Sequence, residues 1–503
     1  MRALVEKAEP LLRSAEQLPW IALLETELDN IRAALDRSIR KGDEEEAAAL
    51  ALAMGWFWWL RNFRREAMEW LTRIVNLGTS ADAEADTQPR HTGLRTNLRM
   101  NVRMYHIFLA IDADPIAAPR GEHWHQRVAE VRAHFERGGP EAARLPGLAW
   151  PLTILADADG PGSPPSDGTG SPPPGDTGTT RPSLPDVAAA LDTVIANCRT
   201  HGGDWEVAAS LMFRTHMVVD SPGGLLGRAV DDDLAELRVL SRRVGDRWLR
   251  AQVCSAAGEA AMARGVFEEA AGEYEEALRL AREVGAHAEA PFLIARLAEI
   301  AYREGDRGRA LATLDEASAA ADRSGVADSR AFVLLLRAQL ALDDQDVAGA
   351  RAMCEQSRAE IARGTPPPQF MAGLNAMDAL VTAEEHGPGR GLLKLTATLR
   401  EAVARGCAEV VTAAIVDAMA GLLARLGDHP RAVRLLAASD SWRGGRPRPM
   451  PDRARAEETE SRARTTLGAE RHESERTTGS ALTVDDVLDE LATLTTAPPN
   501  STP

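Results

Sequence analysis

Apolar residues recur along most of the chain at the spacing of one face of an α-helix. In the first such segment the apolar residues occupy positions i, i+4, i+7 and i+11, as Leu24, Leu28, Ile31 and Leu35. Acidic residues lie between them. This period predicts an amphipathic helix, which we expect to end at Lys41-Gly42-Asp43. Further helices are predicted from about residue 44 through Trp56-Phe57-Trp58-Trp59, and from about 64 to 77. From about 91 to 155 the pattern stays helical but is interrupted by prolines: Pro115, Pro119, Pro140 and Pro146.

The second half of the chain carries an internal repeat of about 40 residues. Its marker is a turn residue that recurs at spacings of 40, 40, 42 and 40: Gly265, Gly305, Gln345, Gly387 and Gly427. Small residues follow four of the five turns by five positions (Ala270, Ala310, Ala350, Ala432) and precede four of them by seven (Gly258, Ala298, Ala338, Ala420), with Leu380 as the exception. Small side chains at fixed places on both helices permit the close crossing of a helical hairpin.

Each predicted hairpin leaves an apolar flank that a neighbouring hairpin can cover. The segment after Gly265, for example, has Phe267, Tyr274 and Leu278 on one face. We therefore predict an all-α fold in which tetratricopeptide-like hairpins stack into a right-handed α-α superhelix. A closed helical bundle is the alternative, but it would not need a repeating register.

Composition divides the chain into four predicted parts. Residues 1–155 form an N-terminal helical block, and residues 187–442 form the superhelix. Between them, residues 156–186 are rich in Pro, Gly, Ser and Thr. Such a segment cannot bury enough apolar surface to fold, so we expect a disordered linker. The apolar periodicity stops after Trp442, and residues 443–503 are expected to be mostly disordered, with a short helix near 483–494 that Thr483 caps.

Charge and cysteine content exclude several classes of function. The 503 residues carry a formal net charge of −17, and a polyanion is repelled by nucleic acids and anionic membranes. We therefore expect no direct nucleic-acid binding and no membrane partner. The arginine-rich stretch 443–476 holds nearly as many acids as arginines. The four cysteines have no metal or redox spacing, so we expect them to be buried thiols: Cys198, Cys254, Cys354 and Cys407. Neither a signal peptide nor a long apolar segment is evident, so we expect a cytoplasmic location.

Candidate catalytic chemistry is absent from the sequence. It contains no G-x-x-x-x-G-K-[ST], H-E-x-x-H, G-x-S-x-G or C-x-x-C motif, so we predict no enzyme activity, no cofactor and no catalytic or metal site. His123-Trp124-His125 offers two imidazoles but no carboxylate or cysteine to complete a metal site. The run Trp56 to Trp59 is interpreted as a helix buried on several sides, the alternative being a role in binding a ligand or partner.

The repeat register also predicts a row of polar side chains. The position after the small packing residue holds Glu259, Glu299 and Gln339 in successive repeats, with Gln252 and Arg303 nearby. The first helices of tetratricopeptide-type hairpins line the concave surface of the superhelix, so these five residues are the candidate interaction site. The alternative is a merely solvated face.

Several stretches resemble a known family. They are LETELDNIRAALDRSIRKGD at 24–43, ALAMGWFWWLRNFRREAMEWLTRIV at 51–75, Gly203-Asp204-Trp205, GDRWLRAQ at 245–252, ARGVFEEAAGEYEEALRLAREVG at 263–285 and LLAASDSWR at 435–443. Together they resemble the C-terminal helical-repeat region of AfsR/SARP-like bacterial transcriptional regulators of the STAND class. In that family a DNA-binding domain, often with a bacterial transcriptional activation domain, and an NTP-binding switch precede repeats that sense an inducer or partner.

The resemblance implies a regulatory role. The expected function is that of a non-catalytic sensor or protein-interaction arm, whose partner is a separate NTP- and DNA-binding regulator or a small-molecule inducer. A bound partner would favour one curvature or packing of the superhelix. The alternative is a constitutive protein–protein adaptor with no role in transcription.

Overall fold

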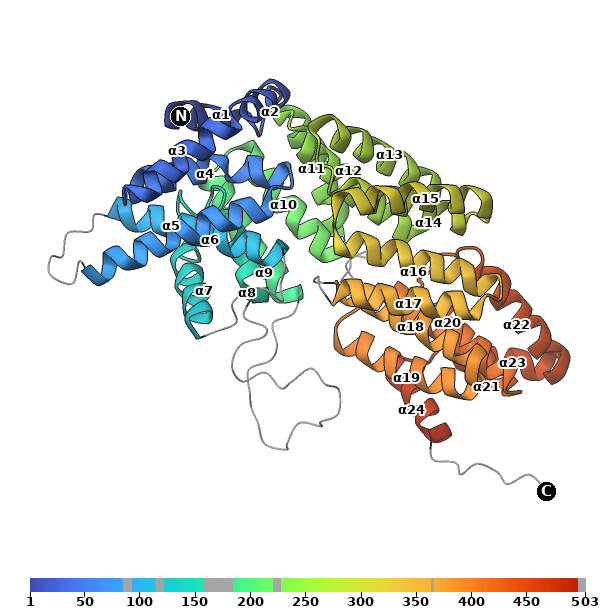
Figure 1. Cartoon of the computed structure of the whole chain (residues 1–503). Coiled ribbons are helices and arrows are strands. Elements are labelled where there is room, and N and C mark those ends of the chain that lie inside the picture. The colour runs from blue at the N-terminus through green and yellow to red at the C-terminus, as the bar shows by residue number, and fades with distance from the viewer. Residues whose placement is uncertain (85–92, 114–121, 157–183, 220–227, 363–365, 496–503) are drawn as a thin grey trace. The chain divides into compact units, whose positions relative to one another are not determined.

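The computed structural model describes residues 1–84, 93–113, 122–156, 184–219, 228–362 and 366–495. Every regular element within these ranges is a helix (Figure 1). The predicted all-α class is therefore confirmed. The segment expected to be a disordered linker, 156–186, lies almost wholly outside the described residues.

The described residues form two compact units. Unit 1 contains Met1–Val218, Arg228–Ala256 and Ala277–His287, and unit 2 contains Ala257–Glu276 and the described residues from Ala288 onward. This division differs from the one suggested by composition, which placed the break at the linker. The boundary instead falls within two helices, α12 (Arg247–Arg264) and α13 (Phe267–Val284).

Unit 1 is built around α4, which contacts α1, α3, α5 and α6. It also holds residues 247–256 of α12 and 277–284 of α13. Its remaining described helices are α1 (Arg2–Leu11), α2 (Gln17–Thr26), α3 (Leu28–Arg40), α4 (Glu44–Leu60), α5 (Arg64–Glu84), α6 (Gly93–Ala113), α7 (Glu122–Phe135), the 3₁₀ helix η1 (Gly147–Leu152), α8 (Thr153–Ala156), α9 (Leu184–His201), α10 (Asp204–Val219) and α11 (Arg228–Val244).

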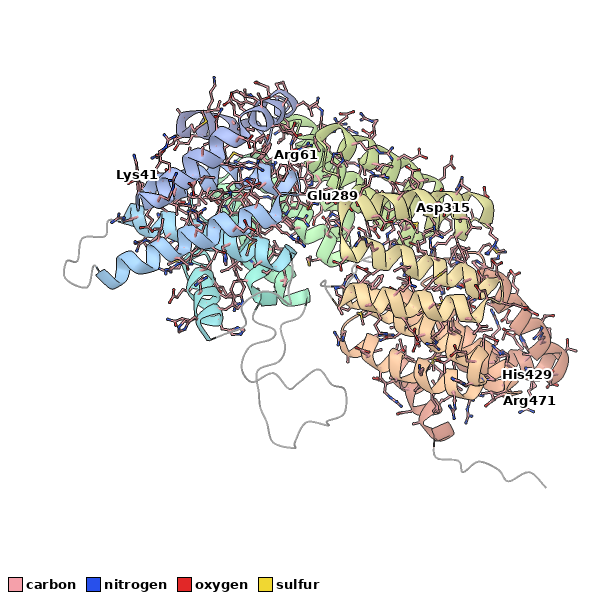
Figure 2. All side chains as sticks on the ribbon, viewed as in Figure 1. Lys41, Arg61, Glu289, Asp315, His429 and Arg471 are labelled. Atoms are coloured by element: carbon pink, nitrogen blue, oxygen red, sulfur yellow. The ribbon has the colours of Figure 1, made fainter. Side chains whose placement is uncertain are left out.

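Aromatic packing explains why α10 and the start of α12 belong with unit 1. Trp205 and Trp248 pack edge-on against Trp56, with ring centroids 5.3 and 4.9 Å apart. Trp56, Phe57 and Trp58 are at most 3 % exposed, so the interpretation of this run as a buried helix is confirmed. Arg61 at the end of α4, labelled in Figure 2, donates to the backbone oxygen of Val284 at 3.0 Å.

Unit 2 consists of helices paired in antiparallel hairpins, which Figure 1 shows in succession from α14 to α21. The pairs are α14 (Ala290–Arg303) with α15 (Arg307–Ser324), α16 (Ala327–Asp343) with α17 (Val347–Ile361), α18 (Pro368–His386) with α19 (Pro388–Ala404), and α20 (Glu409–Arg425) with α21 (His429–Trp442). The predicted stacking of tetratricopeptide-like hairpins is confirmed within this unit.

The repeated turn residue has a conformational cause. Gly305 and Gly427 have φ of +85° and +83°, and Gln345 holds the same left-handed conformation at +61°, which glycine adopts most easily. The next residue is an aspartate that caps the following helix by accepting from a backbone N–H three positions on: Asp306, Asp346 and Asp428. A left-handed residue followed by a capping aspartate thus stops one helix and starts the next.

The small residues of the repeat lie where the helices cross. Ala270, Ala310, Ala350 and Ala432 are all fully buried. The hairpin of α18 and α19, which breaks the sequence pattern at Leu380, uses small residues one position earlier. A Cβ added to Gly391 would lie 2.5 Å from that of Ala383, and Ala379 is also fully buried. The exception is therefore a shift in register and not a loss of close packing.

The expectation of a mostly disordered segment after Trp442 is wrong for the described residues. They form α22 (Asp452–Leu467) and α23 (Ala469–Gly479), which contact each other and pack against α20 and α21. Their turn residue is Gly468, with φ of +77°, 41 positions after Gly427. They therefore make a further hairpin in the same register.

Apolar periodicity does not predict this hairpin, because its buried side is formed mainly by small residues and not by an apolar stripe. Its buried positions are Ala456, Ala463, His472 and Gly479, and a Cβ at Gly479 would lie 2.3 Å from the carbonyl oxygen of Arg434. The last helix, α24 (Val484–Thr495), lies where the sequence placed a short helix, and its Val487 and Leu491 join the core of unit 2.

Candidate functional site

The first helices of successive hairpins form a continuous row in unit 2. α14 contacts α16, α16 contacts α18, and α18 contacts α20. Each second helix packs against the next first helix, as α15 does on α16. We call this set, together with residues 257–264 at the end of α12, the first-helix row. Glu259, Glu299, Arg303 and Gln339 all belong to it.

Three of the predicted residues meet in one charged network centred on Arg296 of α14. Its guanidinium pairs with Glu259 at 2.8 Å and with Glu299 at 2.7 Å. Glu299 also pairs with Arg303 at 2.7 Å. The side chains remain 22 % exposed for Arg296, 16 % for Glu259, 8 % for Glu299 and 34 % for Arg303. The network is therefore largely desolvated but still reachable from solvent at its edge.

Two phenylalanines flank the central arginine. The guanidinium of Arg296 lies 5.1 Å from the ring centroid of Phe292 and 5.0 Å from that of Phe332. Phe292 and Phe332 are 5.7 Å apart, and Phe370 of α18 continues the series. Cation–π contacts favour a planar guanidinium over an ammonium in such a place.

The network has a definite charge state. Burial raises the pKa of Glu299, but Arg303 and Arg296 outweigh it and lower that pKa to about 2. Burial also raises the pKa of the Tyr274 hydroxyl well above its ordinary value, with the neighbouring Glu259 adding to the effect. At neutral pH the carboxylate of Glu299 is therefore ionised and the hydroxyl of Tyr274 keeps its proton.

The other two predicted residues are not part of this network. Gln339 of α16 donates to Asp343 on its own helix at 3.4 Å. Gln252 belongs to unit 1, where its backbone hydrogen-bonds the ring of His216. Of the five candidates, the structure thus brings together Glu259, Glu299 and Arg303.

Sequence reasoning missed the residues that hold the network together. Arg296 was not singled out, because a lone arginine on a predicted helix is normally solvated. A signal did exist for the phenylalanines, since Phe292 and Phe332 are 40 positions apart and share the register of the repeat.

The remaining candidate groups form no site. Trp124 is 5 % exposed and packs against the ring of His106 with centroids 6.2 Å apart. Within the described residues, no group of three or more His, Cys, Asp or Glu side chains could hold a metal ion. No disulfide joins the four cysteines, all of which lie in described residues, and Cys198, Cys354 and Cys407 are buried. None of the helices described has the length and apolar character needed to cross a bilayer.

An open pocket of about 610 Å³ lies on α17, α18 and α19. Its lining includes Arg351 and Lys394, and both pair with Asp378, Lys394 at 2.7 Å. Arg351 also pairs with Glu385 at 2.7 Å. Because these cations already have carboxylate partners, the pocket offers less unsatisfied charge than its composition suggests.

The arrangement on the first-helix row fits binding better than catalysis. The charges of Glu259, Arg296, Glu299 and Arg303 neutralise one another, and no nucleophile lies beside a general base among them. Aromatic rings beside exposed edges of a charged network provide both apolar contact and polar direction for a partner.

Comparison with known proteins gives no family. No family model matches the sequence, and no curated protein matches it. Among solved structures, yeast Tom70 is similar over 92 % of this chain and 95 % of its own, at 10 % identity and a TM-score of 0.34. The APC/C hetero-tetramer Cut9–Hcn1 is similar over 92 % of this chain and 86 % of its own, at 12 % identity and a TM-score of 0.36.

Proposed function

We propose that this chain is a non-catalytic binding protein that recognises a protein partner through the first-helix row of unit 2. The observation that carries the proposal is the network of Glu259, Arg296, Glu299 and Arg303, flanked by Phe292 and Phe332. Buried ion pairs contribute little net stability, so a network that joins two hairpins and stays open to solvent is better suited to specificity. Interfaces are enriched in arginine and aromatic side chains of this kind.

We propose further that the partner links the chain to transcription, as the sensor arm of a STAND-type regulator. The support is the sequence resemblance over 24–43, 51–75, 245–252 and 263–285. The alternative remains a constitutive adaptor without a role in transcription. A small-molecule inducer in place of a protein is a second form of the same proposal.

Direct DNA binding is not part of the proposal. Most arginines of the stretch 443–476 pair with acids, among them Arg453 with Glu457 and Arg471 with Glu475. Non-specific DNA affinity comes from cations that are available to phosphates. We therefore expect the purified chain to leave promoter DNA unshifted at physiological salt, and its effect on transcription to pass through another protein.

The proposal is tested by comparing matched alanine variants in cells of the source organism. Arg303→Ala removes a charged side chain from the first-helix row. Arg309→Ala removes an exposed charge of the same kind from α15, the second helix of the same hairpin, where Arg309 is 53 % exposed and pairs with Glu304. We expect cross-linking mass spectrometry to recover the partner with wild type and with Arg309→Ala. With Arg303→Ala it should recover at least about tenfold less, the scale of the few interface residues that dominate binding energy. Equal recovery from all three would overturn the assignment of this surface.

The transcriptional part has a separate readout. Deletion of the gene should change a defined set of transcripts, and wild type and Arg309→Ala should restore them while Arg303→Ala should not. An unchanged transcript profile, together with a partner recovered as above, would favour the constitutive adaptor.

A further inference from the structure

The helices that pack against α19 leave one of its sides exposed to solvent. α19 contacts α18, α20 and α24, and its apolar side joins the core of unit 2 through Leu392, Leu395 and Leu399. Another set of positions, spaced three or four residues apart, is exposed: Arg390, Leu393, Lys394, Ala397, Arg400 and Ala404. Residues at this spacing share one side of a helix. We call this set the α19 face. Because α19 is the second helix of its hairpin, the α19 face is distinct from the first-helix row.

The α19 face carries a large apolar side chain beside a hollow. Leu393 is 53 % exposed, and Ala397 lies one turn further along the same side of the helix. Leu393 also lines the open pocket of about 610 Å³ on α17, α18 and α19. The strongest contacts of an interface are made where an apolar side chain of one partner fills a hollow of the other. Leu393 and the pocket offer a place for such a contact.

Two cations of the α19 face lack an acidic partner. Lys394 pairs with Asp378 at 2.7 Å, but among the described residues no carboxylate pairs with Arg390 or Arg400. Arg390 also lies in the first turn of α19, which holds no acid. The helix dipole disfavours a positive charge at that end of a helix. The stability of α19 therefore does not explain the position of Arg390.

The charge of the α19 face is opposite to that of the chain as a whole. The formal net charge of the chain is −17, whereas the part of α19 from 388 to 400 contains Arg390, Lys394 and Arg400 and no acid. The acids that line the pocket, Glu355 and Glu385, belong to α17 and α18. A negatively charged partner is repelled by most of such a protein and attracted to its positive face. Electrostatic attraction thus directs an acidic partner to α19.

Another side of α19 shows what kind of element packs on this helix. α24 carries four acids and no basic residue, and its Val487 and Leu491 belong to the same apolar cluster as Leu395 and Leu399 of α19. Figure 1 shows α24 next to α19, in agreement with their contact. An acidic amphipathic helix therefore occupies one side of α19 within the chain itself.

We propose that the α19 face is a docking surface for an acidic amphipathic helix of a partner protein. The apolar side of that helix packs on Leu393 and Ala397, and its carboxylates pair with Arg390 and Arg400. The two arginines are ten positions apart, which is about 15 Å along a helix. The partner helix therefore carries acids about three turns apart. This surface does not depend on the function proposed for the first-helix row.

The test measures peptide binding to the full chain by fluorescence anisotropy in low salt. The probe is a synthetic helical peptide of about five turns, with Leu on one side and Glu flanking it, and a second peptide has Gln in place of every Glu. We expect the Glu peptide to bind with a dissociation constant of about 100 μM or tighter. The Gln peptide should bind at least about tenfold more weakly, because it keeps the apolar contact and loses the charges. Arg390→Glu, Arg400→Glu and Leu393→Ser should each weaken binding of the Glu peptide by about tenfold.

Matched variants on α15 serve as controls. Arg309→Glu and Leu311→Ser change residues that are 53 % and 39 % exposed, and both should leave binding of the Glu peptide unchanged. Arg303→Ala should also leave it unchanged, which separates the α19 face from the first-helix row. Circular dichroism checks the helical content of each variant.

Three results would overturn the proposal. They are binding of the Glu peptide to wild type more weakly than stated, equal binding of the two peptides, and equal losses from the α15 or Arg303 variants. A membrane is the other surface that a basic, apolar helix side can fit. Sedimentation of wild type with vesicles of phosphatidylserine and phosphatidylcholine, abolished by Leu393→Ser, would assign the α19 face to a membrane and overturn the proposal as well.

Discussion

Arg296 donates a hydrogen bond to Glu259 at 2.8 Å, across 37 positions of the chain. The contact joins the end of α12 to α14, and the same guanidinium bonds Glu299 at 2.7 Å. One arginine therefore compensates two carboxylates of which one, Glu299, is nearly buried. The pairing makes Arg296 the structural centre of the candidate surface.

Replacing Arg296 with Met should lower the free energy of unfolding of the chain by about 3 kcal/mol, because Glu259 and Glu299 would then face each other with one cation fewer. Urea titration followed by circular dichroism gives the value. Arg309→Met is the matched control, since Arg309 is 53 % exposed and pairs with Glu304, and exposed pairs contribute roughly 0–1 kcal/mol. Similar losses in both variants would contradict the central role of Arg296.

Acid should weaken unit 2 through Glu299. Burial raises its pKa, but Arg303 and Arg296 together bring it from 4.5 down to about 2. A carboxyl whose pKa is lowered on folding stabilises the protein above its unfolded pKa and loses that contribution as pH falls toward the folded pKa. Compared with wild type, Glu299→Gln should therefore lose less stability between about pH 5 and pH 2. Parallel pH profiles for the two proteins would contradict this.

On acidification, unit 1 should begin to lose stability at a higher pH than the pH at which protonation of Glu299 weakens unit 2. Burial lowers the pKa of His106 to about 4, assisted by Arg127, and burial lowers that of His216 to about 4. Each ring is therefore neutral in the folded protein, and protonation between its ordinary pKa of 6.5 and about 4 favours unfolding. Nuclear magnetic resonance titration of the two rings should find both neutral at pH 6, and a protonated ring at that pH would refute the assignment.

The sequence revealed the repeats because their turns impose a local rule. A left-handed backbone position followed by a capping aspartate needs the same two residue types each time, as at Gly305-Asp306 and Gly427-Asp428. The rule is local, so it can be read without knowing which hairpins touch. The small residues at the helix crossings follow the same register for the same reason.

The parts that escaped prediction depend on contacts between distant residues. The helices α22 and α23 lack an apolar stripe and are held by backbone approach at Gly479 and by the pairing of Arg434 with Glu475 and Glu490. The charged network likewise depends on Arg296, whose partners lie on two helices. Periodicity identifies which face of a helix is polar, but not which polar residues pair across helices.

The single non-glycine residue among the predicted repeat turns should be a source of strain. Gln345 has φ of +61°, a conformation that costs L-residues with a Cβ about 1 kcal/mol or more. Gln345→Gly should therefore raise the thermal midpoint of unfolding, whereas Gly305→Ala, at φ of +85° with open space around it, should lower it. Differential scanning calorimetry measures both, and a lower midpoint for Gln345→Gly would contradict the argument.

Asp246 should be the most sensitive of the helix-capping aspartates. It is fully buried, and its carboxylate accepts from Gln17 Nε2 at 2.9 Å, from Trp205 Nε1 at 2.8 Å, and from the backbone N–H of Trp248 and Leu249 at 2.8 and 3.3 Å. Burial raises the pKa of Asp246 although all four donors act to lower it. The side chain thus joins the start of α2, α10 and α12.

Asp246→Ala should lower the free energy of unfolding by about 3–5 kcal/mol, because it removes a cap and leaves buried donors of Gln17 and Trp205 without an acceptor. Asp306→Ala is the matched control. Asp306 caps α15 from an exposed position and serves one backbone N–H, so its loss should cost only about 1 kcal/mol. Urea unfolding of the full chain, followed by tryptophan fluorescence, compares the two. Trp205 and Trp248 both contact the Asp246 carboxylate, the first through its side chain and the second through its backbone N–H, so Asp246→Ala should also shift the fluorescence emission of the folded protein. Equal losses in the free energy of unfolding for the two variants, together with an unchanged emission spectrum, would rule out a special role for Asp246.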